Sequence, residues 1–341
     1  MRLRFARAFA PFLAVAAMLC GAAACSKSGA GKIRVAYVTN GSVSFWTLAA
    51  AGAKKAGVDL GVDVDVRMPE TPTDQQRVIE ELVNLGIDGI ALSPIDGKNQ
   101  AAMIDEACSR THFILHDSDA PGTKRRCFVG VDNYEAGRAA GKLVKEALPS
   151  GGKFQLFIGR LGQDNAIKRC QGVIDEVFGW TYDPARQTSQ DEVVQEDGYH
   201  FLGIRVDGFD EAQAMRLAEA SLQQVPDLGC MVGLFAYNTP AILEALRDAG
   251  KLGQVKVVAF DEADASLQGI LDGHVIGTVA QKPYEYGYES VRLLKELKQG
   301  QTDKLPADGF LRVPFTVVKQ GNAQGFWDAL KAQLAAAKSS G

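Results

Sequence analysis

Four polar side chains each follow a buried, strand-like run of the sequence: Asp117, Asn238, Asp261 and Gln281. In a parallel sheet the carboxyl ends of the strands lie at one edge, so these carboxylates and carboxamides are expected to meet in one crevice where a ligand binds. Each of them alone is more typical of a helix cap or a turn. Four such residues at equivalent strand ends are harder to explain by capping alone.

Two adjacent aromatic residues, Phe45 and Trp46, stand in the polar loop after the first predicted strand, Ile33–Val38. Large flat rings in a loop at a strand end suit the C–H face of a sugar or another planar molecule. The alternative is a hydrophobic staple, in which both rings pack into the core at the start of the helix predicted from Thr47 to Gly57. The residues themselves leave both interpretations open.

The elements that position these residues alternate between strand and helix along the chain. The predicted strands of the first half are Ile33–Val38, Val62–Arg67, Gly89–Ser93 and Phe113–His116. The pattern restarts after Cys127–Val131, and the second half has predicted strands at Lys153–Ile158, Phe201–Val206, Cys230–Phe235, Val255–Phe260 and Val275–Ala280. A long loop is predicted for Gly179–Tyr199, a last strand for Phe310–Val318 and a helix for Ala323–Lys338. This order predicts an α/β protein with two doubly wound parallel-sheet lobes.

The first residues have the pattern of an export signal. Three arginines precede an apolar run, Phe9–Cys20, and small residues follow, so residues 1–24 are expected to be a secretory signal peptide. The small residues before Cys25 resemble a bacterial lipoprotein signal, although Ala22 stands where leucine is preferred. We therefore expect a lipid on Cys25 and a flexible tether over residues 25–31.

Composition excludes some classes of partner. The chain has 37 Lys and Arg against 41 Asp and Glu, and without the three signal arginines the count is 34 against 41, a net charge of about −7. Such a chain lacks the basic character that nucleic acid requires. Cys108 and Cys127 stand near each other in the predicted fold, so a disulfide between them is possible. Cys170 and Cys230 are expected to be buried thiols, and none of the four has metal-ligand spacing.

The chain from about Ile33 to Lys319 resembles the periplasmic sugar-binding proteins of the ribose/galactose type, the solute receptors of ABC importers, which are related to the ligand domains of LacI-type repressors. The motifs that carry the resemblance are Phe45-Trp46, Asp88–Pro94, Asp117, Val131–Asn133, Ala236–Asn238, Ala259–Asp261 and Thr278–Gln281. The resemblance implies the type I periplasmic binding protein fold, with two lobes joined by a three-strand hinge. Residues 32–132 and 282–309 would form lobe one, and residues 133–281 and 310–341 lobe two, with crossings near Asp132, Gln281 and Phe310.

The resemblance also implies roles for individual residues. Phe45 and Trp46 would flank a sugar, and Phe209 would supply an aromatic ring from lobe two. Groups that hydrogen-bond the sugar hydroxyls would be Asp117, Asn238, Asp261 and Gln281, and Asn40 completes this set. Two departures concern arginines: Ser118 replaces one of them, and Ile167 stands where the family has the other, with Lys168 and Arg169 just after it. Arg160 and Asn165 are expected to supply replacement contacts, and Ser118 itself is also expected to contact the ligand.

The resemblance implies a periplasmic lipoprotein that captures a small sugar or related polyol and delivers it to an ABC permease. We expect a monomer that is not an enzyme and that uses neither a cofactor nor a metal. It is expected to bind no nucleic acid and to contact the membrane only through the lipid. A receptor that feeds a sensor or chemotaxis partner is the alternative. Enzyme signals are weak, because no G-x-G-x-x-G follows the first strand and no nucleophile elbow is present. A metal at His116, Asp117 and Asp119 is disfavoured, since adjacent strand residues point to opposite faces.

Overall fold

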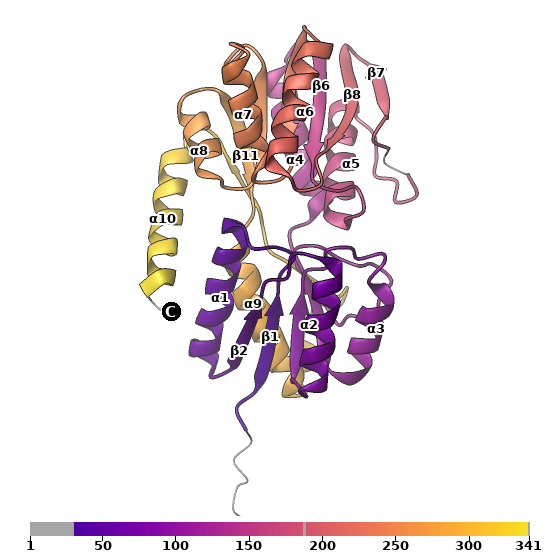
Figure 1. The fold of residues 1–341 in the computed structure, drawn as a ribbon, viewed down its shortest axis with the longest axis vertical. Coiled ribbons are helices and arrows are strands. Elements are labelled where there is room, and N and C mark those ends of the chain that lie inside the picture. The colour runs from indigo at the N-terminus through magenta and orange to yellow at the C-terminus, as the bar shows by residue number, and fades with distance from the viewer. Residues whose placement is uncertain (1–30, 187–188, 340–341) are drawn as a thin grey trace, which may run out of the picture. The chain divides into compact units, whose positions relative to one another are not determined.

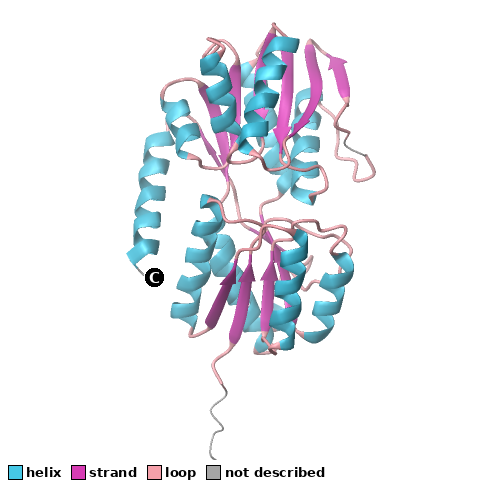
Figure 2. Cartoon of the chain, viewed as in Figure 1, coloured by secondary structure: helices cyan, strands magenta, loops and turns pink. Residues whose placement is uncertain are grey.

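The computed structural model describes residues 31–186 and 189–339. The described residues from Lys32 onward form one compact unit that contains two β-sheets with helices on both faces of each (Figures 1 and 2). The expected signal peptide, the lipid site Cys25 and most of the expected tether lie outside the described residues. Among the described helices, none is both long enough and apolar enough to span a membrane.

The first sheet has six strands, and every pairing in it is parallel. Its spatial order is β12-β5-β4-β3-β1-β2. The strands are β1 (Arg34–Val38), β2 (Asp63–Arg67), β3 (Gly89–Leu92), β4 (His112–His116), β5 (Phe128–Gly130) and β12 (Phe310–Arg312). We call this sheet and its helices the first lobe.

The second sheet has seven strands in the order β13-β11-β10-β9-β6-β8-β7 and defines the second lobe. The strands are β6 (Gly152–Ile158), β7 (Val193–Glu196), β8 (Tyr199–Val206), β9 (Leu228–Gly233), β10 (Lys256–Phe260), β11 (Val275–Ala280) and β13 (Thr316–Val318). Its centre is parallel, whereas the two edge strands β7 and β13 are antiparallel to their neighbours. The predicted α/β fold with two lobes is confirmed.

Helices cover both faces of each sheet, and each face has its own hydrophobic core cluster. In the first lobe these helices are α1 (Ser44–Leu60), α2 (Pro72–Asn84), α3 (Ala101–Arg110) and α9 (Pro283–Lys298), followed by the short 3-10 turn η1 (Thr302–Lys304). In the second lobe they are α4 (Asn133–Ala147), α5 (Asp164–Phe178), α6 (Glu211–Gln224), α7 (Asn238–Asp248) and α8 (Asp264–Leu271). The last helix, α10 (Ala323–Ser339), packs against α8 and also against α1 of the first lobe (Figure 1).

Three segments cross between the lobes. Val131 and Asp132 join β5 to α4, and Gln281 and Lys282 join β11 to α9, at the positions expected for two of the crossings. The third crossing was expected near Phe310, but Phe310 lies in β12 and pairs with β5 of the first lobe, so the crossing falls between Arg312 and Thr316. The sequence predicts one strand over Phe310–Val318, whereas the structure has two, β12 and β13. Pro314 separates them, because proline cannot donate a ladder hydrogen bond.

Two other expectations need correction. The predicted loop Gly179–Tyr199 contains the strand β7, which pairs with β8 at the edge of the second sheet. Most of its side chains are exposed, so the sequence lacks the apolar alternation that reveals a strand. Cys108 and Cys127 are free thiols, as are Cys170 and Cys230, and the last two are buried as expected.

Close helix packing in the second lobe fixes the position of α5. A side chain on Gly137 of α4 would place its Cβ 2.4 Å from the carbonyl oxygen of Arg169 in α5, and one on Gly172 would lie 2.2 Å from the carbonyl oxygen of Tyr134. Only glycine permits the two helices to approach each other so closely at these positions. The contact holds the amino-terminal half of α5 beside the hinge.

Candidate functional site

A cavity with a volume of about 150 Å³ lies between the two lobes, at the carboxyl ends of the central strands. Both lobes contribute to its walls. The first lobe provides Asn40, Phe45, Trp46 and Asp117. The second lobe and the hinge provide Gln163, Asn165, Arg169, Phe209, Glu211, Phe235, Tyr237, Asp261 and Gln281.

Phe45 and Trp46 form the aromatic wall of the first lobe. The sequence analysis placed both rings in the loop before the helix. Helix α1 begins at Ser44, however, so both rings lie in its first turn. They contact each other edge to face, with ring centroids 4.9 Å apart. Phe45 packs against Tyr286 and Trp46 against His116, both buried in the core. The two rings therefore belong to the core and also line the cavity, which confirms the core packing, while their contact with a ligand stays a prediction.

The second lobe provides an aromatic wall of its own. The rings of Phe209 and Phe235 meet edge to face at 5.4 Å, and Tyr237 lies 6.0 Å from Phe209. Phe209 has a positive φ of 69° and is 39% exposed, which makes it the most accessible of the three rings. The hydroxyl of Tyr237 donates to Asp207 at 2.5 Å, which fixes the orientation of its ring.

Asp117 and Asp261 occupy equivalent places in the two sheets. Asp117 follows β4 and Asp261 follows β10, and both have left-handed backbone conformations, with φ of 59° and 65°. The amide of each donates to a carbonyl of the adjacent strand, Val129 and Val279 respectively. A left-handed residue other than glycine carries backbone strain, which persists where the surrounding structure enforces it and is concentrated at functional sites. These two residues are therefore strong candidates for ligand contact.

Each of the two carboxyl groups is held by a short chain of hydrogen bonds. On the first lobe, Asn40 Nδ2 donates to Ser93 Oγ at 2.9 Å, and Ser93 Oγ donates to Asp117 Oδ2 at 3.0 Å. At the hinge, the Tyr286 hydroxyl donates to Gln281 Oε1 at 2.9 Å, and Gln281 Nε2 donates to Asp261 Oδ1 at 2.7 Å. The chain to Asp117 uses only Oδ2 and leaves Oδ1 to accept from a ligand, whereas Asp261 also accepts from the backbone amide of Ala236.

Arg169 is the cation of the site, and the sequence analysis did not assign it. It is 1% exposed, its Nε donates to Asn133 Oδ1 at 2.9 Å and its Nη1 donates to the Leu234 carbonyl at 3.0 Å. The guanidinium lies over the rings of Phe260 and Phe235, at 4.1 and 5.3 Å from their centroids. Its Nη2 has no hydrogen-bond partner among the residues that the structure describes. A donor therefore remains for an acceptor atom of a ligand.

Burial and Arg169 act in opposite directions on the carboxyl groups. Burial raises the pKa of Asp117 to about 6, while the charge of Arg169 and the hydrogen bond from Ser93 lower it. Burial also raises the pKa of Asp261, which Arg169 and the hydrogen bond from Gln281 oppose. The cavity is thus lined by two buried carboxyl groups that charge reluctantly, by the exposed carboxyl group of Glu211 and by one guanidinium.

Eight of the eleven predicted binding residues line this cavity. They are Asn40, Phe45, Trp46, Asp117, Asn165, Phe209, Asp261 and Gln281. Ser118, Arg160 and Asn238 are not among the lining residues. Asn165 accepts at Oδ1 from the backbone amide of Ala166, which leaves its amide nitrogen available to a ligand.

The three residues outside the lining have other surroundings. Asn238 is fully buried, and its amide accepts from Phe235 N at 3.0 Å and donates to Asp207 Oδ2 at 2.8 Å, so it holds the turn before α7. Its neighbour Tyr237 lines the cavity instead. Ser118 is buried, and its Oγ has no hydrogen-bond partner among the described residues. Arg160 is exposed and lies over the outer ring of Phe209, 5.2 Å from its centroid.

A sequence signal for Arg169 does exist. The inner face of α5 contains Ala166, Arg169, Cys170 and Val173, which have the i, i+3, i+4, i+7 spacing of a buried stripe, and all four are buried. A cation on an otherwise apolar stripe requires partners inside the protein. The resemblance to the family places its arginine two positions earlier, at Ile167.

Comparisons with known proteins place the chain in a family. Residues 34–302 match the model of the periplasmic binding protein domain, so the chain belongs to the periplasmic binding protein family. This family consists of solute-binding proteins, which confirms the expectation that the chain is not an enzyme.

Individual relatives are more distant. The chain is 24% identical to a D-ribose/D-allose-binding protein of Pseudomonas aeruginosa, over 73% of this chain and 75% of that one. It is also 24% identical to the D-allose-binding periplasmic protein of Escherichia coli, over 77% of this chain and 84% of that one. A solved ABC transporter solute-binding protein of Burkholderia graminis, in complex with D-arabinose, superposes with a TM-score of 0.76 at 26% identity, covering 85% of this chain and 96% of the other.

Proposed function

We propose that this protein is the sugar-binding component of an ABC import system and that it captures one monosaccharide between its two lobes. The observation that carries the proposal is the cavity itself, which both lobes line with aromatic rings and with the buried carboxyl groups of Asp117 and Asp261. Relatives named for ribose and allose, and a similar structure with bound D-arabinose, support a sugar as the ligand.

The composition of the cavity favours a neutral sugar. A cavity of about 150 Å³ in another protein accommodates benzene, so the volume here suits a ring of six atoms. Rings on both walls can cover the apolar C–H faces of such a ligand. Its hydroxyl groups would donate to Asp117 and Asp261 and accept from Arg169. Because the carboxyl groups of Asp117, Glu211 and Asp261 line the cavity with a single guanidinium, a sugar phosphate or sugar acid would meet net repulsion.

Binding and closure of the lobes are linked in this proposal. Trp46 and Asp117 belong to the first lobe, whereas Arg169 and Asp261 belong to the second, so a ligand contacts both sets only when the lobes are closed. Such a ligand shifts the equilibrium toward the closed form by its differential affinity for that form. Hinge closure around a ligand is the motion known for periplasmic binding proteins. The closed form would then be the one that a membrane permease recognises.

Export and anchoring remain part of the proposal. The amino-terminal pattern of residues 1–24 and the candidate lipid site Cys25 support a periplasmic lipoprotein that acts as a monomer. Mass spectrometry of the protein purified from membranes tests this point. A diacylglyceryl-modified Cys25 at the mature amino terminus supports the anchor, and an unmodified terminus at another residue contradicts it.

The function is tested by a thermal-shift panel followed by calorimetry. The purified protein, unfolded and refolded to remove any bound sugar, is screened with D-ribose, D-allose, D-arabinose, D-xylose, D-fructose, D-glucose and D-galactose. A sugar at 100 times its Kd adds about 2.7 kcal/mol to the free energy of unfolding. For a protein of this size that corresponds to a Tm increase of roughly 5 °C or more. A concentration of about 10 mM reveals even a weak ligand. No shift in Tm with any of these sugars at that concentration would contradict the proposal.

A further inference from the structure

A hydrogen bond joins the two lobes at the mouth of the cavity, away from the hinge. Gln163, which precedes α5 in the second lobe, donates from Nε2 to the carbonyl oxygen of Ile95 in the first lobe at 3.2 Å. Both residues are buried, and Gln163 also lines the cavity at 2% exposure. The site described above uses neither its amide nor the Ile95 carbonyl. The bond can exist only while the lobes are closed.

The acceptor of this bond is fixed by a network within the first lobe. Ile95 N donates to Gln75 Oε1 at 3.1 Å. Gln75 Nε2 in turn donates to the carbonyl oxygens of Thr39 and Ser93, at 2.8 and 2.9 Å. Thr39 precedes Asn40, and Ser93 holds the carboxylate of Asp117. The segments that orient the ligand-binding groups of the first lobe are therefore the ones that present the Ile95 carbonyl to Gln163.

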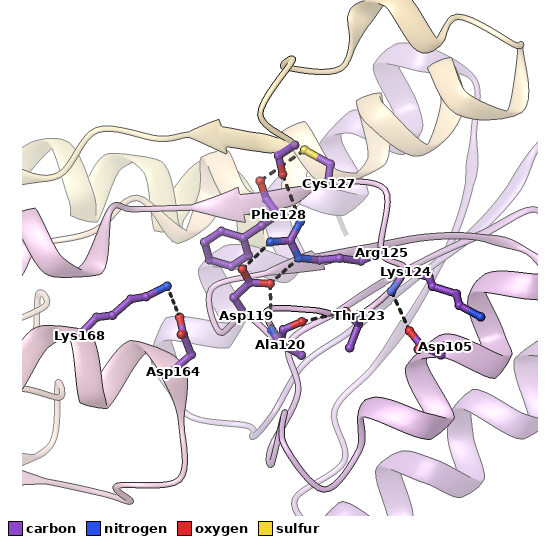
Figure 3. A network of polar contacts seen from close by, with 11 residues as sticks. Asp105, Asp119, Ala120, Thr123, Lys124, Arg125, Cys127, Phe128, Asp164 and Lys168 are labelled. Carbon is purple, nitrogen blue, oxygen red and sulfur yellow. Dashed lines mark hydrogen bonds and ion pairs between the residues drawn. The ribbon is translucent and has the colours of Figure 1, made fainter. Parts of the chain in front are cut away.

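Charged groups of the two lobes also lie near each other, with Asp119 and Arg125 on one side and Asp164 and Lys168 on the other (Figure 3). In the first lobe, Arg125 Nη2 donates to Asp119 Oδ2 at 2.6 Å, and Asp119 is 6% exposed. In the second lobe, Lys168 and Asp164 form an ion pair at 2.8 Å in the first turns of α5. Burial opposes the charged form of Lys168, but Asp164, together with Asp119 of the other lobe, raises the pKa of Lys168. Two ion pairs therefore lie near each other across the cleft, where Lys168 attracts Asp119 and Arg125 attracts Asp164, while Asp119 and Asp164 repel each other.

We propose that Gln163 is a positioning residue that latches the second lobe onto Ile95 when a sugar is bound, with the attraction between Lys168 and Asp119 guiding the approach. This inference rests on the proposed function and adds a residue that controls how long the sugar stays bound. The latch does not hold the lobes together by itself. Gln163 Oε1 is buried with no partner among the described residues, and the loss of its water on closure reduces, without cancelling, the net gain from the bond that Nε2 makes. The contacts of the ligand supply the remaining free energy.

The test compares Gln163→Ala with Gln171→Ala. Gln171 is the matched control, because it is an equally buried glutamine of α5 whose Nε2 donates to a carbonyl, that of Arg186, within the second lobe. Dissociation rates are measured by stopped-flow tryptophan fluorescence for every sugar that shifts the Tm in the panel above. We expect Gln163→Ala to raise koff by about three- to tenfold, the range set by the loss of one hydrogen bond. Gln171→Ala should leave koff within about twofold, since distant core changes do not act on closure.

A latch between lobes has a signature that a direct ligand contact lacks. The increase in koff should be the same for each sugar, because the lost bond is between protein groups, and the Tm of the ligand-free Gln163→Ala protein should equal that of the wild type. An unchanged koff, an increase confined to some sugars, or an equal increase in Gln171→Ala would each overturn the latch while the proposed function stands. A wild-type protein that bound none of the sugars would overturn the proposed function, and the latch with it.

The electrostatic part has its own variant pair. Lys168→Gln removes the charge that faces Asp119, and Lys145→Gln removes a lysine that pairs with Glu176 at 2.9 Å inside the second lobe. At low salt we expect Lys168→Gln to raise koff about two- to threefold and Lys145→Gln to leave it unchanged, as for single partly exposed charges. In about 1 M salt, where the Debye length is about 3 Å, the two variants should match the wild type. An equal effect of both lysines, or one that salt does not reduce, would overturn the guiding role.

Discussion

Sugar affinity should fall as the pH is lowered through about 6, because the carboxyl group of Asp117 must be ionised to accept from two hydroxyl groups. Burial raises the pKa of Asp117 to about 6. The protonated fraction of such a group is about one tenth at pH 7 and about nine tenths at pH 5. A ligand that binds the ionised form must first remove that proton, so the Kd should be about tenfold higher at pH 5 than at pH 7. Asp261, whose pKa burial also raises, acts in the same direction.

Calorimetry provides the assay for this pH dependence. Titrations of the sugar from the panel between pH 7.5 and 4.5 give the Kd, and repeating them at pH 6 in buffers of different ionisation enthalpy gives the number of protons released. Half of the Asp117 carboxyls are protonated at a pH equal to the pKa, so about 0.5 proton should be released per sugar bound at pH 6.

The control for the pH dependence is Asp117→Asn, which should bind more weakly and show a much flatter pH profile. It retains Asp207, whose pKa is also raised to about 6, chiefly by burial, but which does not line the cavity. A wild-type Kd that is constant from pH 7.5 to 5 would refute the reasoning. A pH profile of Asp117→Asn as steep as that of the wild type would assign the effect to another group.

Three further predictions concern single residues. Asp261→Ala should weaken binding at least tenfold by calorimetry, since a hydrogen bond to a charged group is worth about 1.5–3 kcal/mol, and an unchanged Kd would remove Asp261 from the site. Arg169→Met should lower the free energy of unfolding in urea by about 3 kcal/mol or more, because it leaves buried carboxyl groups without their cation. Arg160 is exposed, so Arg160→Met should change the free energy of unfolding by less than about 0.5 kcal/mol. Equal effects of the two substitutions would contradict the buried role of Arg169. Asn238→Ala should lower the free energy of unfolding by about 1–3 kcal/mol, because it removes the partner of Asp207 Oδ2 and of Phe235 N. It should change the Kd far less than Asp261→Ala does, and a tenfold weaker Kd would restore Asn238 to the binding site.

The two-lobe fold could be predicted because its determinants are local. Short apolar runs that alternate with amphipathic segments specify a parallel sheet with helices on both faces. The errors arose where local pattern is weak or two signals overlap. β7 is a short exposed edge strand with no apolar face, and Pro314 divides a continuous β-like run between two sheets. Which sheet a short strand joins depends on tertiary packing, which the sequence pattern does not contain.

The site could be predicted as far as strand ends determine it. Asp117 and Asp261 follow buried strands directly, so the topology of a parallel sheet brings them together. Asn238 shows the limit of that argument. It lies beyond the end of β9 at the first residue of α7, where an amide serves the helix turn as readily as a ligand. Arg169 was missed because its role depends on the close contact of α4 with α5, which turns one face of α5 toward the hinge.

The aromatic pair shows why a choice between core and ligand was not possible in advance. Phe45 and Trp46 are almost fully buried, and they still form part of the cavity wall. A ring can pack one face and edge against the core while another face remains toward the cleft. Sequence periodicity reports only that a ring lies on an apolar face.

The most direct test of the account is a crystal structure of the protein with the sugar that binds most tightly in the panel. We expect one sugar ring between the first-lobe rings of Phe45 and Trp46 and the second-lobe rings, with hydroxyl groups within hydrogen-bonding distance of Asp117, Arg169 and Asp261. A sugar bound elsewhere, or one that contacts groups of a single lobe only, would contradict the claim that ligand capture occurs between two closing lobes.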